Sequence, residues 1–311
     1  MIINVGMRSD IVACYTPWLL NRLKEGYAYS RNPYNKSEVY SYDLKPENVD
    51  ALIFCSKDYS PILNDISWIN DKYNIFCHYT ITSYGRDVEV NLSSIDDNIK
   101  TLKKLSSLIG LEKLAWRFDP ILLTEKYGID YHLDKFEYIA KRIHDDVSYC
   151  VFSFVDLYPK ILDNMPELLE ITSRDKEELL EGLGRISGKY GLPIQTCAIN
   201  EDYSKYNIKK SGCITSKILE EANGIRFKNI NHEGNRKNCR CIPSRDIGAY
   251  NTCINGCRYC YANKNHDRAL INYSRHDVNS PLLVGNVRSD DRIINVKQES
   301  LLLDDRQMRL F

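Results

Sequence analysis

The chain has 311 residues, of which 43% are hydrophobic and 27% charged, and its formal net charge is zero. These values are those of an ordinary soluble globular protein with one large barrel-type domain or two smaller ones. No apolar run reaches the roughly 18–20 residues that span a bilayer, and the N-terminus MIINVGMRSDI lacks the basic and apolar regions of a signal peptide, so we expect a cytoplasmic protein.

Six short segments in the first 225 residues predict β-strands. They are rich in apolar and aromatic residues and do not alternate cleanly with polar ones, which is typical of strands buried on both faces of a sheet. These segments are residues 2–6, 51–56, 75–81, 113–118, 149–155 and 193–199.

Helical patterns lie between the predicted strands. Apolar residues recur at helical spacing in residues 94–109 behind Ser94, in 134–144, in 173–190 behind Ser173, and in 215–223 before Gly224. Alternation of strands and helices predicts a parallel α/β fold, and six or more units within residues 1–225 favour a TIM-like barrel, complete or partial. No G-x-G-x-x-G follows the first strand, which disfavours a dinucleotide-binding domain.

Polar residues follow most of the predicted strands. In a parallel barrel the chemistry lies at the carboxyl ends of the strands, so these residues are candidates for the barrel mouth, although helix caps and surface ion pairs remain alternatives. Arginine and lysine there would suit a carboxylate or a phosphate. The candidate catalytic residues are Arg8, Asp10, Lys57, Arg117, Asp119 and Asp156.

The periodic pattern fades from residue 226. Residues 226–275 carry ten Lys or Arg and three acidic residues, a net charge of +7. This charge indicates a surface for phosphate or nucleic acid, although a solvated loop or cations that balance an anionic cluster would look the same. We therefore divide the chain into a barrel domain (1–225), a cysteine-rich segment (226–266) and a C-terminal extension (267–311).

The cysteine-rich segment contains the spacing C-x3-C-x2-C at Cys253, Cys257 and Cys260. Three thiolates on one loop can bind three corners of a 4Fe-4S cluster and leave the fourth iron open, and Asn255-Gly256 helps the loop to wrap. Zinc prefers paired C-x2-C knuckles with four protein ligands, and Cys257 with Cys260 could form one such knuckle. A zinc-dependent barrel hydrolase is therefore an alternative, as are unligated thiols. Disulfides do not fit eleven cysteines in a cytoplasmic protein.

Together with Tyr259, this spacing resembles the signature of the radical S-adenosylmethionine (SAM) enzymes. The stretches MRSDI, RNPYN, WRFDP and residues 239–263 together resemble an uncharacterised bacterial family with a C-terminal radical-SAM-like cysteine cluster. The resemblance covers essentially the whole chain. It implies a barrel-type fold, a 4Fe-4S cluster that binds SAM at its open iron, and an electron donor such as flavodoxin or ferredoxin. Whether the enzyme is a lyase or an oxidoreductase stays open.

The position of the motif departs from that superfamily, in which it follows the first barrel strand. Here it follows the whole barrel-like region. We therefore expect residues 226–266 to fold back over the barrel mouth and to bring the open iron near Arg117 and Asp119.

Four further cysteines, Cys197, Cys213, Cys239 and Cys241, lie between residues 197 and 241. Four is the number that fully ligates a second cubane, so we expect a second 4Fe-4S cluster on this set. The alternative is that Cys197 and Cys213 are ordinary small buried residues. The remaining cysteines, Cys14, Cys55, Cys77 and Cys150, are expected in the core.

The chain ends in QMRLF, and Gln307, Met308, Leu310 and Phe311 resemble the peptide by which bacterial repair proteins bind the DNA sliding clamp. The alternative is that this tail docks on the protein's own core. Together with the basic region, the tail makes a nucleic acid or nucleotide the leading substrate class, as in DNA repair by photoproduct lyases. A non-catalytic iron–sulfur protein that binds nucleic acid is the alternative function.

Overall fold

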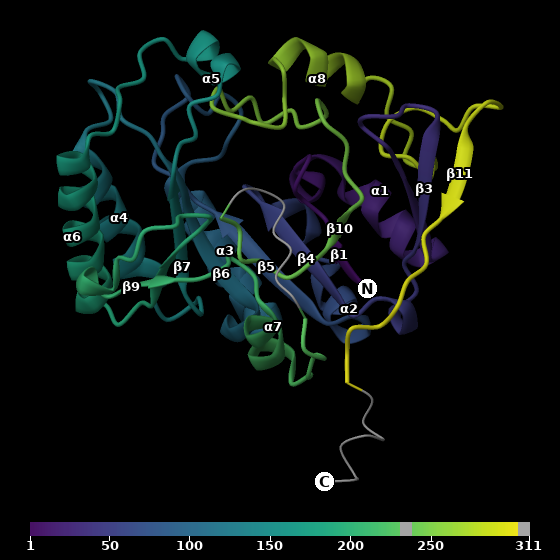
Figure 1. The fold of residues 1–311 in the computed structure, drawn as a ribbon, viewed down its shortest axis with the longest axis horizontal. Helices are drawn as coiled ribbons and strands as arrows, with labels where there is room; N and C mark the ends of the chain where they lie inside the picture. Colours follow the sequence, from purple (N-terminus) through teal and green to yellow (C-terminus); the bar gives the residue numbers. More distant parts are fainter. Residues whose placement is uncertain (231–237, 304–311) are drawn as a thin grey trace, which may run out of the picture.

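The structure, a computed structural model, describes residues 1–230 and 238–303. Its main feature is an eight-stranded sheet in which every recorded pair of neighbouring strands is parallel (Figure 1). In sheet order its strands are β10 (Arg245–Asp246), β1 (Ile2–Asn4), β4 (Ala51–Ser56), β5 (Ile75–Thr80), β6 (Leu114–Ile121), β7 (Cys150–Phe154), β8 (Ile194–Thr196) and β9 (Ile208–Lys210). The predicted parallel α/β fold is confirmed.

The strand order from β1 to β9 follows the chain, as in a parallel barrel, and β10 returns to pair with β1. β9 and β10 are the two edges of the sheet, and among the described residues no pairing joins them. Closure of the barrel is therefore not shown. We call the space between these two edges the seam.

Helices separate most of the sheet strands along the chain. They are α1 (Ile11–Glu25), α2 (Ile66–Lys72), α3 (Ile95–Ile109), α4 (Ile129–Ile143), α5 (Pro159–Asn164), α6 (Ser173–Lys189), α7 (Ser216–Asn223) and α8 (His266–Tyr273). Short 3-10 turns cover Pro46–Asn48, Ser60–Ile62, Leu111–Lys113 and Ser204–Tyr206.

The predicted helix ends are mostly correct. The Ser94 hydroxyl accepts a hydrogen bond from the Asp97 amide at the start of α3, and Gly224 ends α7 in the left-handed conformation. The prediction of Ser173 as the N-cap of α6 is wrong by one residue. Thr172 is the cap because its side chain and that of Asp175 bond reciprocally in a capping box.

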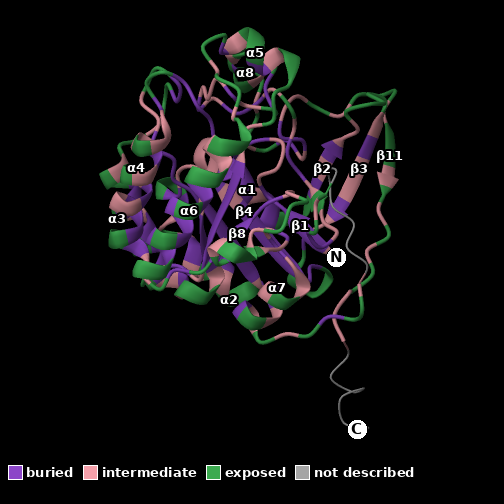
Figure 2. Ribbon diagram, turned by 60° about the vertical axis from the view of Figure 1, so that its left-hand side comes forward, coloured by how far each residue is buried: buried purple, intermediate pink, exposed green. Residues whose placement is uncertain are grey.

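Alternate residues of the strands point to two different cores. On β4, Leu52 and Phe54 pack with residues of helices α1 to α4 and α6, whereas Ala51 and Ile53 belong to a second cluster inside the curved sheet. In Figure 2 the central strands of the large sheet are mostly buried, whereas β3 and β11 of the smaller sheet are partly exposed. On β6, Trp116 and Phe118 belong to the outer core, whereas Arg117 between them lies near Cys197 and Cys213 on the inner face.

The amino ends of the strands are covered by α7, while α5 and α8 lie at the opposite end of the sheet (Figures 1 and 2). The side chain of Asn223, the last residue of α7, bonds to the backbone of Ile75, the first residue of β5. Its Oδ1 accepts from the Ile75 amide and its Nδ2 donates to the Ile75 carbonyl, both at 3.1 Å. One side chain thus fastens the helix to the sheet.

A smaller sheet lies beside β1 and has the order β11-β3-β2. β2 (Tyr27–Arg31) and β3 (Glu38–Asp43) are antiparallel, and β11 (Arg292–Asn295) adds in parallel to β3. The C-terminal segment therefore packs against the N-terminal part of the chain. No helix among the described residues has the length and apolar character needed to cross a membrane.

Replacing Asn223 should measure how strongly α7 is fastened. Asn223→Ala leaves the buried Ile75 amide and carbonyl without these partners, so we expect a loss of about 1–3 kcal/mol in the free energy of unfolding. Urea denaturation followed by circular dichroism measures it. The control, Glu221→Ala, changes an exposed residue of the same helix and should stay within about 0.5 kcal/mol. Equal losses in the two variants would contradict the assignment.

Candidate functional site

The cysteine loop, residues 247–263, lies on the loops that follow the sheet strands. The Tyr261 hydroxyl donates to the carbonyl of Met7, after β1, and the Thr252 carbonyl accepts from the Tyr15 hydroxyl at 2.6 Å. The Arg258 amide bonds to the Val88 carbonyl at 3.0 Å, in the segment after β5. The loop thus covers the carboxyl ends of β1 and β5, at the end of the sheet opposite α7 (Figure 1).

Asp10 joins this loop to the sheet. One carboxylate oxygen accepts from the Ala13 amide at 3.0 Å, as the N-cap of α1, and from the Ser56 hydroxyl at 2.6 Å. The other accepts from the Lys57 amide and from Asn255 Nδ2, each at 2.9 Å. Burial raises the pKa of Asp10 and these hydrogen bonds oppose the rise. With both oxygens engaged by four donors, Asp10 acts as a positioning residue.

The turn between Cys253 and Cys257 needs its glycine. Gly256 has φ +73°, and a Cβ there would lie 3.1 Å from the Cβ of Val90. The neighbouring backbone is clamped by Asn91, whose amide donates to the Asn255 carbonyl at 3.1 Å and whose side chain donates to the Ile254 carbonyl at 2.8 Å. Sequence and contacts together thus fix the conformation of the thiol-bearing loop.

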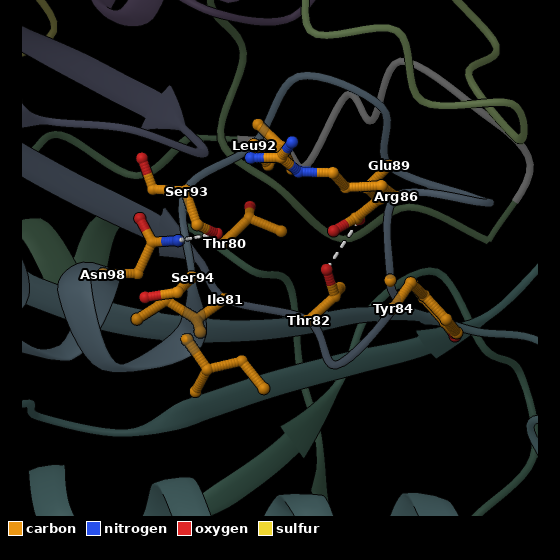
Figure 3. A pocket seen from close by; sticks show the side chains of 12 residues that line it. Thr80, Ile81, Thr82, Tyr84, Arg86, Glu89, Leu92, Ser93, Ser94 and Asn98 are labelled. Carbon is orange, nitrogen blue, oxygen red and sulfur yellow. Dashed lines mark hydrogen bonds between the residues drawn. The ribbon is translucent and has the colours of Figure 1, made fainter.

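A buried ion pair lies beside Cys257. Lys57 Nζ is 2.8 Å from Glu89 Oε1, the hydroxyl of Tyr259 donates to the same oxygen, and the Lys57 ammonium is 5.6 Å from the centre of the Tyr259 ring. Thr82 also donates to Glu89, at 2.6 Å, at the edge of a cavity of about 200 Å³ (Figure 3). Sequence analysis missed Glu89, which belongs to no motif and follows no strand directly.

The three thiols of the motif are close enough to influence one another. Burial raises the pKa of Cys257 and of Cys260, and the charge of Cys253 adds to both shifts. A hydrogen bond with Cys14, followed by burial, raises the pKa of Cys253. Buried thiols favour the neutral form unless a cation offsets the charge, and bound iron would provide one. Cys14 is only partly buried, and its contact with Cys253 was not foreseen.

The other four cysteines also gather, inside the curved sheet. Cys213 Sγ is 3.2 Å from Cys241 Sγ, Cys197 bonds to Cys213, and Cys239 bonds to Cys241. Cys197 directly follows β8, and Cys213 lies just beyond β9. Cys239 and Cys241 precede β10. The four thiols therefore join the two sides of the seam.

Neither set is a formed metal site. Within residues 1–230 and 238–303, no three His, Cys, Asp or Glu side chains are arranged to hold a metal ion. The 3.2 Å between Cys213 and Cys241 is shorter than the roughly 3.8 Å between two thiolates on one tetrahedral zinc, and the thiolates of a cubane, one on each iron, are farther apart still. Zinc and iron–sulfur ligation would both move these thiols apart. The donor chemistry fits either.

A polar group lies between the two sets of cysteines. Arg117 donates to Asp119, which also accepts from the Ser153 hydroxyl. Burial alone would lower the pKa of Arg117, but Asp119, Cys213 and other thiols raise it above its ordinary value. His78 is buried, which lowers its pKa, and its ring nitrogens have no hydrogen-bond partner among the described residues. Arg117 also opposes the rise in the pKa of Tyr261, so its charge is felt in the cysteine loop as well.

The remaining predicted residues lie elsewhere. Arg8 binds Asp246, with Nε 3.2 Å from its carboxylate, and lines a larger cavity beside the cysteine loop. Asp156 is exposed and accepts from the Tyr158 hydroxyl at 3.5 Å, outside the buried group. The candidate clamp-binding residues Gln307, Met308, Leu310 and Phe311 lie outside the described residues.

Comparison with known families gives one match. The profile of a family described as a domain of unknown function, DUF1848, matches residues 2–262. The chain belongs to the DUF1848 family. The match includes the eight-stranded sheet and both sets of cysteines. Searches of curated proteins and of solved structures gave no match. The family description names no reaction, so the function of this DUF1848 protein is argued from its site.

Substitution of Gly256 should destabilise the cysteine loop. Gly256→Ala places a side chain at φ +73°, which costs about 1–2 kcal/mol, and also forces the new Cβ against Val90. Gly191→Ala is the matched control, because Gly191 has φ +63° and nothing within 4 Å of an added Cβ. Anaerobic urea denaturation should show a larger loss for Gly256→Ala. An equal loss would mean that the contact with Val90 contributes nothing.

Proposed function

We propose that this DUF1848 protein is a radical-SAM-type iron–sulfur enzyme. In this proposal Cys253, Cys257 and Cys260 bind three irons of a 4Fe-4S cluster and leave the fourth for SAM. The observation that carries it is the position of the three thiols, one buried and two partly buried, on one clamped loop at the carboxyl ends of parallel strands. Parallel α/β folds hold their reactants at that end of the sheet.

The donor set suits this cofactor. Three cysteine thiolates on a short loop are a ligand set for an iron–sulfur cluster, and a fourth protein ligand would leave no iron open. Bound to Cys253, Cys257 and Cys260 and reduced by a donor such as flavodoxin or ferredoxin, such a cluster would supply the single electron needed for reductive cleavage of SAM.

The chain's own residues would hold and shield this centre. Asp10, through Asn255, fixes the loop against the ends of β1 and β4. Lys57 places a positive charge next to Cys257, where it offsets part of the negative charge of bound thiolates. The Tyr259 ring, with its hydroxyl on Glu89, covers this ion pair. Together these groups would orient the loop and offset part of its charge.

The four cysteines at the seam support a second, auxiliary cluster as part of this proposal. They provide the full ligand number for a cubane, and two come from each side of the seam. A metal cluster there would link β9 to β10 where no backbone pairing joins them. Arg117, whose pKa is raised in part by Cys213, lies beside this set and supplies a positive charge.

Reductive cleavage of SAM is the direct test. Anaerobically purified protein with reconstituted iron should, with dithionite and SAM, produce 5′-deoxyadenosine, measured by liquid chromatography and mass spectrometry. Cys257→Ala should abolish it, because the open cluster loses a ligand, whereas Cys77→Ala, a cysteine of the outer core, should retain it. Iron-loaded protein that makes no 5′-deoxyadenosine would favour the alternative of a non-catalytic iron–sulfur protein that binds nucleic acid.

Iron content tests the number of clusters. Two cubanes predict about eight irons and eight sulfides per chain, and one predicts about four. Cys213→Ala combined with Cys241→Ala should lower the count to about four and leave SAM cleavage measurable. A count of about four in the unchanged protein would remove the auxiliary cluster. Zinc in place of iron would favour a zinc-dependent hydrolase instead.

A further inference from the structure

A second cavity, of about 670 Å³, lies between the cysteine loop and the smaller sheet. Its walls come from parts of the chain that are far apart in sequence: residues 29–36, residues 247–252, residues 261–275 and residues 282–288. We call it the basic groove. Its volume is in the range of ligand-binding sites.

The charge of the basic groove is one-sided. Eight of its lining residues are Arg or Lys, and none is Asp or Glu, although the chain as a whole is neutral. Two of these cations are neutralised, since Arg8 pairs with Asp246 and Arg31 with Asp291. Lys36, Lys264, Arg268 and Arg275 are exposed and form no ion pair within the described part of the chain. A row of uncompensated cations attracts a ligand with several negative charges.

Exposed aromatic rings lie among these cations. Tyr34 is 94% exposed, Tyr261 57% and Tyr250 40%, and all three line the basic groove. The Arg8 guanidinium lies 5.8 Å from the centre of the Tyr250 ring. Unpaired nucleic-acid bases stack on such rings, and cations bind the phosphates along the backbone. This combination is typical of proteins that bind single-stranded nucleic acid.

The basic groove adjoins the cysteine loop. Its lining includes Thr252, which precedes Cys253, and Tyr261, which follows Cys260. Lys160, another lining residue, donates to the carbonyls of Tyr261 and Asn263, the latter at 3.0 Å. A nucleic-acid strand held in the groove would therefore pass beside the loop that carries the thiols.

We propose that the basic groove binds single-stranded nucleic acid, with phosphates on Lys264, Arg268 and Arg275 and bases on Tyr34 and Tyr250. This deepens the proposed function, on which it rests, because it assigns the substrate class of the same site. A duplex keeps its bases stacked on one another and cannot offer their faces to these rings. Strand binding itself needs only the cations and rings of the groove.

Binding is measured by fluorescence anisotropy of a labelled 12-nucleotide DNA of mixed sequence, against full-length protein purified anaerobically. We expect the single strand to bind more tightly than the duplex of the same sequence, and affinity to fall as salt rises. The Lys264→Ala, Arg268→Ala double variant should reduce the slope of log affinity against log salt by roughly 1.4, from about 0.7 per phosphate contact on a single strand. Lys141→Glu, an exposed lysine on α4 outside the groove, is the control and should bind normally.

The rings give a test that charge alone does not. Tyr34→Ala and Tyr250→Ala should each weaken binding roughly 5- to 150-fold, whereas Tyr34→Phe and Tyr250→Phe keep the ring and should retain affinity. Equal binding of the duplex, equal binding of inorganic polyphosphate, or no effect of the alanine variants would each overturn the proposal.

The two proposals can fail separately. Protein that binds the strand and carries no cluster keeps the groove inference and loses the radical-SAM function. Protein that cleaves SAM and binds no single strand keeps the function and loses the groove inference. A variant with Cys253, Cys257 and Cys260 changed to alanine should retain strand binding if it unfolds with the same urea midpoint as the unchanged protein.

Discussion

The buried carboxylate of Asp10 is the contact on which the candidate site depends. It caps α1, holds the chain where β4 ends, and binds the side chain of Asn255 in the cysteine loop. A buried carboxylate is costly unless its oxygens are satisfied by donors, so these partners are tied to one another. The start of α1, the end of β4 and the thiol-bearing loop therefore have fixed positions relative to one another, although more than 240 residues separate Asp10 from Asn255.

The two edges of the sheet at the seam are connected without strand pairing. Backbone pairing holds the sheet together from β10 through β1 to β9 but does not join its two edges in the described residues. The segments that flank these edges meet instead, through the four clustered thiols and through a backbone hydrogen bond from the Ile242 amide to the Ile214 carbonyl at 3.0 Å. Gly212 allows this approach, since a Cβ there would lie 2.4 Å from the Arg240 carbonyl oxygen. Close packing at the seam thus leaves the cysteines in contact without a continuous strand ladder.

Much of the fold follows from local sequence, and the site does so only in part. Apolar runs such as residues 51–56 predict buried strands, and six of the eight sheet strands are found where the pattern indicates them. β9 and β10 are too short for a pattern, and β11 depends on a partner at the other end of the chain. The cysteine spacing marks the thiols, but Glu89 and Cys14 reach them only through tertiary packing, which no local motif records.

The strand order also explains how a motif so late in the chain can lie at the carboxyl end of β1. In a barrel-like order the last strand is the neighbour of the first, and β10 pairs in parallel with β1 at Ile3 and Arg245. A loop that follows β10 therefore leaves the sheet beside the loop that follows β1. Cys253 thus lies close to Cys14 of α1, the helix that directly follows the β1 loop. A cysteine loop after the last strand and one after the first would occupy neighbouring positions, so the late motif needs no unusual crossing of the sheet to serve the same end of it.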